Sequence, residues 1–324
     1  MHSIEYRRLG TSGLTVSTVG LGCNNFGRVG TFTEDQQGSS LVIDAAIDAG
    51  ITFFDTADIY GAERGLSETL MGNALRGKRN GIVLATKFGM DMDGRNGADW
   101  NARGSRRYIR LAVEASLKRL QTDWIDLYQL HQPDPGTPIE ETLSTLDDLI
   151  SEGKIRYIGH SNLAGWQISE AEFTAQLNRH PHFVSSQNEY SLLERSAERE
   201  VLPAVRAYGL GFLPFFPLYN GLLTGKFSRD GGPEDSRIMR IRKHLADDAP
   251  WDVLEQYQRF CDERNVTMLE ATFTWLLAQP SLSSVIAGAT KPEQVAQNAA
   301  AASWKATSAD IDEISRIFDQ NQPK

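Results

Sequence analysis

The sequence predicts a (β/α)8 barrel, and three observations lead to this fold class. Short apolar segments alternate with helical patterns along the 324 residues, so that eight strands are expected. Most neighbouring strands are separated by about the length of one strand–helix unit. The competing fold, a doubly wound dinucleotide-binding sheet, would place a Gly-x-Gly-x-x-Gly motif after an early strand, and none is found there. We therefore expect one barrel domain over residues 1–324.

A β-hairpin is expected before the barrel. Residues 4–9 have the pattern of a strand, residues 10–13 supply turn-forming glycines, and residues 14–19 alternate between apolar and polar side chains. A hairpin that precedes the barrel strands suits a lid or a plug for the barrel.

The barrel strands and helices follow in chain order. Strands are expected at residues 18–22, 51–54, 82–86, 125–130, 155–159, 183–186, 211–216 and 284–287. Helices are expected at residues 33–49, 66–76, 106–120, 138–152, 164–177, 197–208, 252–264 and 268–278, with two more from Pro292 and Thr307. Capping boxes at residues 33–36 and 290–293 open two of these helices. A long polar stretch follows the seventh strand.

The composition favours a cytoplasmic protein with a small-molecule ligand. The net charge is −9, and no run of Lys or Arg interleaves with aromatic residues, so neither nucleic acid nor an anionic membrane is an expected partner. Cys23 and Cys261 are too few and too distant for a disulfide framework. No apolar run suits a signal peptide or a membrane span. Nothing in the sequence indicates an oligomeric state.

Four ionisable residues are expected where consecutive strands end. Asp55 and Tyr60 follow the second strand, Lys87 the third and His131 the fourth. In a barrel these ends gather at one face, where catalysis takes place. Lys87 is expected to lower the pKa of Tyr60 toward neutrality, while Asp55 keeps the lysine charged. Tyr60 then becomes a general acid, and His131 a hydrogen-bond partner for the same substrate oxygen.

Each residue also has a structural interpretation. Asp55 suits a loop cap, Tyr60 a core aromatic, Lys87 a solvated strand end, and His131 a brace for the turn at Pro133. Taken singly, these interpretations have about even weight. Together the four residues favour an active site, because packing alone does not require ionisable groups at matching strand ends. No metal is expected.

The chain resembles an aldo-keto reductase along nearly its whole length. The matching segments are RRLGTSGLTVSTVGLGCNNFG, FFDTADIYG, LATKFG, DWIDLYQLHQPDP, IRYIGHSNL, SSQNEYSLL, FFPLYNGLLTGKF and IAGATKPEQVAQN. The resemblance implies a barrel whose N-terminal hairpin closes the bottom, and NADPH bound without a Rossmann motif. It also implies a catalytic tetrad at Asp55, Tyr60, Lys87 and His131.

The resemblance also implies how the nicotinamide is held. Ser161, Asn162 and Gln187 would bind the carboxamide, and hydroxyl and amide groups can match both its C=O and its NH2. The alternative for the first two is an ordinary strand-to-helix cap. Phe215 would stack on the nicotinamide ring, whereas Phe216 replaces a family serine and removes one cofactor hydrogen bond. Both phenylalanines also suit a plain core.

The other implied cofactor contacts extend to the phosphates and the adenosine. Lys226 and Arg237 would lie near the phosphates and, with the helix opening at Thr290, predict a preference for NADPH over NADH. Their alternative is solvated surface charge. Gln297 stands where many members carry Glu. The remaining contacts are Gly22, Leu218, Gly221, Leu223, Gly288, Gln294 and Asn298.

The expected function is NADPH-dependent reduction of an aldehyde or ketone. Phe26, Trp100 and Tyr219 are candidate substrate walls on loops, and they favour an apolar or aromatic carbonyl compound. One alternative is a non-catalytic, cofactor-sensing subunit of a membrane channel. His131 favours the enzyme, because the channel-associated relatives carry an amide there. Another alternative is a Schiff-base lyase that uses Lys87, although Asp55 argues against a neutral amine.

Overall fold

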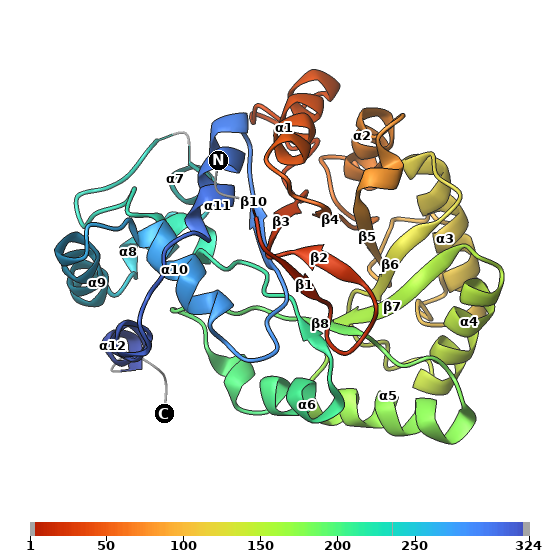
Figure 1. The fold of residues 1–324 in the computed structure, drawn as a ribbon. Helices are drawn as coiled ribbons and strands as arrows, with labels where there is room; N and C mark the ends of the chain where they lie inside the picture. Colours follow the sequence, from red (N-terminus) through yellow and green to blue (C-terminus); the bar gives the residue numbers. More distant parts are fainter. Residues whose placement is uncertain (1–3, 235, 320–324) are drawn as a thin grey trace.

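The computed structural model describes residues 4–234 and 236–319, and its centre is an eight-stranded parallel sheet that curls into a barrel (Figure 1). The strands are β3 (Val19–Gly22), β4 (Phe53–Asp55), β5 (Val83–Phe88), β6 (Ile125–Leu130), β7 (Ile155–Ser161), β8 (Ser185–Gln187), β9 (Gly211–Phe212) and β10 (Val285–Gly288). They are paired in the order β10-β3-β4-β5-β6-β7-β8-β9. A parallel bridge from Phe212 to Leu282 completes the circle. The predicted fold class is confirmed.

Helices surround the strands on the outside of the barrel (Figure 1). Those that alternate with strands are α1 (Gln36–Asp48), α2 (Leu66–Ala74), α3 (Arg106–Leu120), α4 (Ile139–Ser151), α5 (Gly165–Asn178), α6 (Val201–Tyr208) and α10 (Met268–Leu277). α11 (Pro292–Ala301) and α12 (Ser308–Asp319) follow the last strand. No helix within the described residues is both long enough and apolar enough to cross a membrane.

The predicted hairpin is present, at the end of the barrel that faces the viewer in Figure 1. It consists of β1 (Tyr6–Arg8) and β2 (Thr15–Ser17), paired antiparallel. Leu9 and Val16 from this hairpin pack in one buried cluster with barrel residues that include Phe53. The hairpin therefore closes the bottom of the barrel with apolar side chains.

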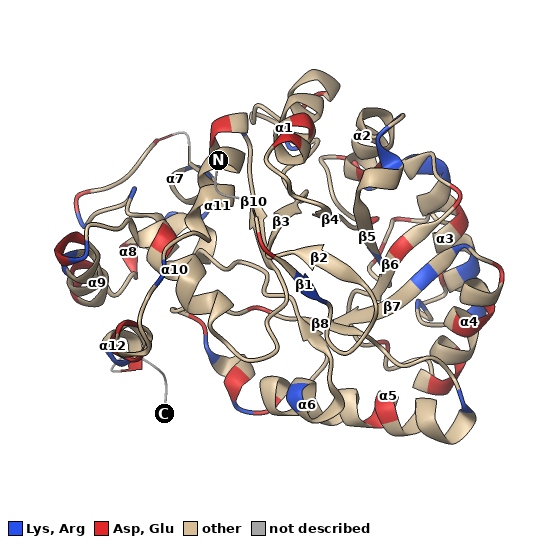
Figure 2. Ribbon diagram, viewed as in Figure 1, with Lys and Arg blue, Asp and Glu red and all other residues tan. Residues whose placement is uncertain are grey.

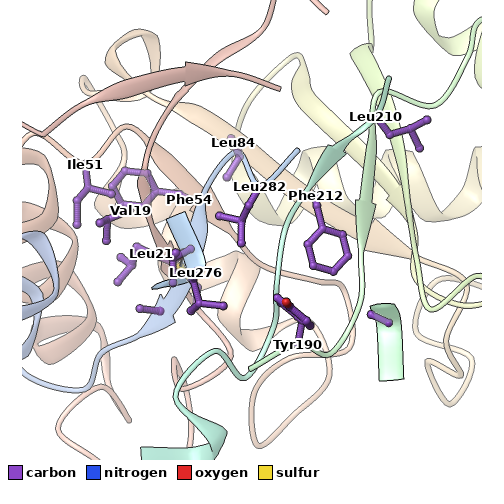
Figure 3. Packing of buried hydrophobic residues seen from close by; sticks show 14 of the residues in the cluster. Val19, Leu21, Ile51, Phe54, Leu84, Tyr190, Leu210, Phe212, Leu276 and Leu282 are labelled. Carbon is purple, nitrogen blue, oxygen red and sulfur yellow. Dashed lines mark hydrogen bonds between the residues drawn. The ribbon is translucent and has the colours of Figure 1, made fainter. Parts of the chain in front are cut away.

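The main core lies between the strands and the helices. Figure 3 shows Leu21 and Phe54, from adjacent strands, close to Leu276 of α10, and all three are in the main buried cluster. Apolar residues thus face both the barrel interior and the helix layer, which explains why these strands are almost wholly apolar in sequence.

Two predicted capping boxes are wrong. The N-cap of α1 is Asp35, whose carboxylate accepts a hydrogen bond from Gly38 N at 2.9 Å, so the helix starts later than a box at residues 33–36 requires. The N-cap of α11 is Lys291, with no side-chain cap. Thr290 instead donates from its backbone nitrogen to Gln294 Oε1 at 2.7 Å. In both cases a nearby polar contact competes with the expected cap.

Four helices follow β9, and the sequence predicted only the last of them. They are η3 (Tyr219–Thr224), α7 (Arg237–Ile241), α8 (His244–Asp247) and α9 (Trp251–Glu263). The first three are short and lie where only a polar stretch was expected. β9 itself is shorter than predicted, and a short 3-10 helix, η2 (Ser196–Glu198), precedes α6. A separate small apolar cluster, which includes Leu222, Ile238 and Ala246, holds the first three of these helices together.

Candidate active site

A buried ion pair lies at the C-terminal ends of β4 and β5. Lys87 Nζ donates to Asp55 Oδ2 at 2.6 Å and to the carbonyl oxygen of Thr56 at 2.8 Å. Lys87 is completely buried and Asp55 almost so. A buried charge pair is tolerated only when its remaining hydrogen-bonding capacity is also satisfied, as it is here by a backbone carbonyl.

Tyr60 and His131 complete a cluster above this pair. Lys87 Nζ lies 5.1 Å from the centre of the Tyr60 ring. The Tyr60 and His131 rings meet edge to face, with 5.9 Å between their centroids. His131 is held directly after β6 by a 2.8 Å hydrogen bond from its backbone nitrogen to Phe88 O. The structure thus brings together the four residues that the sequence placed at the strand ends.

Electrostatics keep the lysine charged and the histidine neutral. Burial opposes the charge on Lys87, but Asp55 and Tyr60 outweigh it and raise the pKa of the ammonium. Burial, and then the neighbouring Lys87, lower the pKa of His131 well below its ordinary value. His131 is therefore a neutral imidazole at pH 7, able to donate a hydrogen bond from one ring nitrogen and accept one at the other.

The expected direction of the Tyr60 pKa shift is wrong. Burial raises the pKa of this phenol, and the attraction of Lys87, which acts in the opposite direction, does not compensate. Asp55 raises the pKa further, whereas a hydrogen bond from the Asn24 side chain lowers it. Tyr60 is consequently a protonated phenol at neutral pH.

A glutamine that the sequence did not single out helps to hold Asp55. Gln129 donates from Nε2 to Asp55 Oδ1 at 3.1 Å, and Gln187 donates to the same oxygen at 3.0 Å. Gln129 lies on β6 two positions before His131, so it faces the barrel interior as His131 does. That alternation was the only sequence signal for it.

Ser161 and Asn162 lie beside this cluster. Ser161 Oγ donates to the backbone oxygen of Gln187 at 2.7 Å. Asn162 adopts a left-handed conformation with φ of 60°, and its Nδ2 donates to His131 O at 2.9 Å. The N-cap of α5 is Ala164, so neither residue is a helix cap. The predicted carboxamide ligands are therefore joined by direct hydrogen bonds to the cluster that contains Asp55 and His131.

Phe215 and Phe216 form an accessible aromatic corner beyond β9. Their rings meet edge to face at 5.3 Å, and both are only partly buried. Phe216 has a φ of 51°, an unusual conformation for a bulky residue. These features argue against the plain core interpretation and favour a surface that contacts a ligand.

Two arginines contact the ring of Phe216, and a third, Arg28, lies close enough to affect one of them. The guanidinium carbons of Arg237 and Arg242 lie 5.7 and 5.4 Å from its ring centre. Burial, and then Arg28 and Arg242, lower the pKa of Arg237 to about 10. Arg28 comes from the loop between β3 and α1, and no sequence pattern had indicated it. Buried nitrogens of Arg28 (Nη1) and Arg237 (Nε) have no hydrogen-bond partner among the described residues, so this cluster suits an anion.

Comparison with known proteins assigns the chain to a family. The sequence model of the Aldo/keto reductase family matches residues 18–319. The chain belongs to the aldo/keto reductase family. It is 40% identical over 300 residues to the uncharacterized oxidoreductase YrpG of Bacillus subtilis (strain 168), covering 90% of this chain and 89% of that protein.

Two further relatives carry different descriptions. The NADH-specific methylglyoxal reductase of Escherichia coli (strain K12) is 35% identical, over 93% of this chain and 94% of that protein. A probable voltage-gated potassium channel subunit beta of Arabidopsis thaliana is also 35% identical, over 91% and 90%. Both descriptions refer to those relatives.

The other predicted cofactor residues of this aldo-keto reductase differ in how exposed they are. Gly22 and Gly288 are register partners on β3 and β10, and a Cβ atom on Gly288 would lie 3.1 Å from Asn25 Nδ2. The space beside Gly288 is thus occupied by the Asn25 side chain. Gly221 has a φ of 112°. Lys226 and Gln297 are exposed, Leu218 and Gln294 are half-buried, and Leu223 and Asn298 are buried.

The three candidate substrate walls lie in different surroundings. Trp100 is 73% exposed, with the Arg107 guanidinium 3.9 Å from its ring centre. Tyr219 is the first residue of η3, in the same segment after β9 that carries Arg237. Phe26 is fully buried in the main core, which contradicts its prediction as an open wall. Its loop folds back onto the barrel, so the aromatic side chain is used for packing.

A buried polar network supports the loop that carries Tyr60. Asp58 Oδ2 accepts from Asn96 Nδ2 at 2.9 Å, and Arg119 bridges Asn96 Oδ1 at 2.9 Å and Glu68 Oε2 at 2.6 Å. Burial, and then Glu68, raise the pKa of Asp58 well above its ordinary value. Glu68 also accepts from Thr86, the neighbour of Lys87. The network therefore connects the Tyr60 loop to the strand of Lys87.

No three His, Cys, Asp or Glu side chains within residues 4–234 and 236–319 come together in a way that would hold a metal ion.

Proposed function

We propose that this aldo-keto reductase reduces an aldehyde or ketone to the alcohol with NADPH, and that Tyr60 is the general acid. The observation that supports this most is the arrangement of a charged, fully buried Lys87 beneath a protonated Tyr60, with a neutral His131 against the same ring. Such an arrangement presents a proton donor and a hydrogen-bond donor to one substrate oxygen.

The chain's own residues divide the work of proton transfer. When bound, the reduced nicotinamide supplies a hydride from its C4 atom to the carbonyl carbon. Tyr60 donates its phenolic proton to the carbonyl oxygen, and the ammonium of Lys87 stabilises the phenolate that remains. Asp55 keeps Lys87 charged, and the neutral His131 donates an N–H to the same oxygen.

A nicotinamide dinucleotide fits the groups around the cluster. Phe215 offers a partly exposed ring face for stacking, while Ser161, Asn162 and Gln187 supply hydroxyl and amide groups for the carboxamide. Buried nitrogens in the arginine cluster, without partners of their own, suit phosphate oxygens.

The preference for NADPH rests on the arginine cluster and not on the family. A relative described as NADH-specific is 35% identical to this chain, so related sequences differ in cofactor choice. The cluster of Arg28, Arg237 and Arg242 concentrates positive charge on a chain whose net charge is −9. The additional phosphate of NADPH is the natural counterion for such a cluster.

A substrate panel tests the proposed activity. Loss of NADPH absorbance is followed with short aldehydes, aromatic aldehydes, diketones and cyclic ketones, and repeated with NADH. We expect turnover of at least one carbonyl class, faster with NADPH. Tight NADPH binding without any turnover would reject the catalytic proposal.

The main alternative is a cofactor-binding regulatory subunit, because a probable potassium channel subunit beta is similar over most of the chain. The complete set of Asp55, Tyr60, Lys87 and His131 favours catalysis over this alternative. A lyase with a Schiff base on Lys87 is disfavoured, because Asp55 and Tyr60 raise the pKa of this amine. Borohydride trapping with a carbonyl compound tests the lyase directly.

A further inference from the structure

Three buried polar side chains form a layer across the inside of the barrel. Asp55, Gln129 and Gln187 lie on β4, β6 and β8. Side chains two positions apart on a strand face the same way, so Gln129 lies one layer above Leu127, which belongs to the apolar cluster at the bottom of the barrel. Figure 2 shows charged residues mainly on the outer helices and loops, with few on the barrel strands. The Asp55 carboxylate is thus one of few charges in this interior, and its amide partners determine how it is held.

Asp55 determines how both amides are turned. A carboxylate oxygen only accepts hydrogen bonds, so Gln129 and Gln187 each turn an N–H toward Asp55 Oδ1, at 3.1 and 3.0 Å. Gln187 Nε2 also donates to Gln129 Oε1 at 3.4 Å. Gln129 therefore donates to one partner and accepts from the other, and the three side chains form a closed triangle of hydrogen bonds.

A glycine on the next strand leaves the space that Gln129 occupies. Gln129 is the register partner of Lys87 on β5 and of Gly159 on β7. A Cβ atom on Gly159 would lie 3.2 Å from Gln129 Cγ and 2.3 Å from Ser185 Oγ. The missing side chain on β7 thus lets the Gln129 side chain extend across the barrel between Asp55 and Gln187.

The triangle leaves one polar atom of the Gln187 side chain free. Its amide nitrogen donates to both Asp55 and Gln129, and no hydrogen bond among the described residues uses Gln187 Oε1. This oxygen is also absent from the fully enclosed polar atoms without a partner, so a ligand can reach it. Turning the amide over would place Oε1 against Asp55 Oδ1, where two acceptors repel each other. Gln187 is therefore held as a hydrogen-bond acceptor.

We propose that Gln129 is a positioning residue for the cofactor, because it holds the Gln187 amide so that Oε1 accepts from the NH2 group of the nicotinamide carboxamide. This inference rests on the proposed function, since it requires a nicotinamide cofactor in the site. Gln129 itself does not touch the cofactor and acts through Gln187. Without Gln129, the Gln187 amide is tied to Asp55 alone and can pivot about that single bond.

Equilibrium binding of three ligands tests this role. NADP⁺ carries the carboxamide, its acetylpyridine analogue keeps the carbonyl but lacks the NH2 group, and phospho-ADP-ribose lacks the whole nicotinamide ring. We expect the wild type to bind NADP⁺ about three- to tenfold more tightly than the analogue, as one neutral hydrogen bond provides. Gln129→Met, which is apolar and of similar length, should lower this preference to about twofold or less and leave the affinity for phospho-ADP-ribose unchanged.

Two further variants of Gln129 and its partner show whether it acts through Gln187. Gln129→Asn keeps the amide but is one methylene shorter, so it should lose the preference as Gln129→Met does. The double variant Gln129→Met/Gln187→Met should have the same preference as Gln187→Met alone, because the two residues act as a unit.

Tyr128→Phe is the matched control on the same strand. Tyr128 packs in the main core on the other side of β6, stacked on Phe88 at 4.7 Å, and its hydroxyl has no partner among the described residues. This variant should keep the wild-type preference for NADP⁺ over the analogue. Circular dichroism verifies that each variant is folded.

Several outcomes would overturn the inference. An unchanged preference in Gln129→Met, or an equal loss of affinity for all three ligands, would show that Gln129 only supports Asp55 or the packing of the barrel. A wild type that binds NADP⁺ and the analogue equally would show that Gln187 Oε1 does not accept from the carboxamide. A wild type that binds phospho-ADP-ribose and NADP⁺ not at all would overturn the cofactor proposal itself, and this inference with it.

Discussion

Tyr60 is the residue on which the proposed proton transfer depends. Replacing it with Phe removes the hydroxyl and keeps the ring that Lys87 and His131 contact. We expect Tyr60→Phe to bind NADPH almost as the wild type does and to lose about 10²-fold or more in single-turnover reduction. Reduction at a near wild-type rate would remove Tyr60 from the role of general acid.

The expected pH dependence of the proposed reaction follows from the directions of two pKa shifts. Tyr60 must be protonated to reduce, and its pKa is raised above the ordinary 10.0. His131 must be neutral, and its pKa is lowered below the ordinary 6.5. Reduction should therefore be nearly constant from pH 6.5 to 10 and fall only at higher pH, whereas alcohol oxidation should rise there. Steady-state rates in both directions test this, and a fall in reduction near neutral pH would contradict it.

Arg237 and Arg28 are the residues that test cofactor choice. A charge-assisted hydrogen bond to phosphate contributes roughly 1.5 to 3 kcal/mol, so Arg237→Ala should weaken NADPH by about ten- to a hundredfold and leave NADH almost unchanged. Arg28→Ala tests whether the cluster acts as a unit. Arg229→Ala is the control on the same loop, because the Arg229 side chain pairs with Asp252 and Glu255. Fluorescence titration with both cofactors measures these effects.

An equal loss of affinity for NADPH and for NADH in Arg237→Ala would show that Arg237 binds the pyrophosphate that both cofactors share, or that it only stabilises the loop. Wild-type affinity for NADPH should also decrease as salt increases, since partly exposed charges are screened. Tighter binding of NADH than of NADPH by the wild type would overturn the cofactor assignment.

The sequence predicted side chains at strand ends better than it predicted their environment. Tyr60, Lys87 and His131 could be placed together because parallel strands in a barrel end at the same face. The direction of the Tyr60 pKa was wrong, since the sequence reveals which charges are near but not how much water the fold excludes. Arg28 was missed because it lies in a loop without any periodic pattern.

The loop after β4 carries Tyr60 and is held by Asp58. The pKa of Asp58 is raised by burial, so the folded protein favours the protonated carboxyl more than the unfolded chain does. Asp58→Asn is a neutral mimic and should keep turnover within about threefold, whereas Asp58→Ala should reduce turnover about tenfold without changing NADPH affinity. The alanine variant also leaves Asn96 without its partner, a loss of about 1 to 3 kcal/mol. Stopped-flow rates and denaturation curves measure both effects.

Stability as a function of pH provides an independent test of Asp58. Its folded pKa lies above the unfolded value of 3.8, so its contribution is present below that pH and is lost as pH rises. Asp58→Asn should remove this loss. Asp123→Asn, at an exposed site, serves as the control. Identical pH profiles for wild type and Asp58→Asn would show that Asp58 is already ionised.

Long periodic elements were predicted closely, and loop-bound elements were not. The helix at residues 106–120 and the strand at 125–130 were predicted with the bounds that α3 and β6 have. The four apolar positions predicted to face the core from the helix are all buried: Ile109, Val113, Leu117 and Leu120. α7 and α8 were missed because each is about one turn long and is stabilised by contacts such as Ile238 in a local cluster.

At the scale of the whole molecule, the packing of the β1–β2 hairpin against the bottom of the barrel depends on a glycine. Gly10 has a φ of 59°, and a Cβ atom there would lie only 2.4 Å from Gly209 O. Gly10→Ala should lower the free energy of unfolding by about 2 to 5 kcal/mol, from backbone strain plus a clash with backbone. Gly77 has a φ of 76° with nothing within 4 Å, so Gly77→Ala should cost only about 1 kcal/mol.

Urea denaturation of the two variants separates the clash from the strain. Equal losses of stability for Gly10→Ala and Gly77→Ala would show that the hairpin shifts freely over the barrel. In that case it would be a loosely attached lid and not a plug.

The pairing of β3 with β10 also affects the order of events during synthesis. Val19 and Val285 are register partners, although they come from opposite ends of the chain. A ribosome releases β3 long before β10 is synthesised. The edge of β3 that pairs with β10 therefore stays open until β10 has emerged. The last step of folding should therefore be slow and exposed to aggregation, and chaperone demand should fall mainly on nearly complete nascent chains.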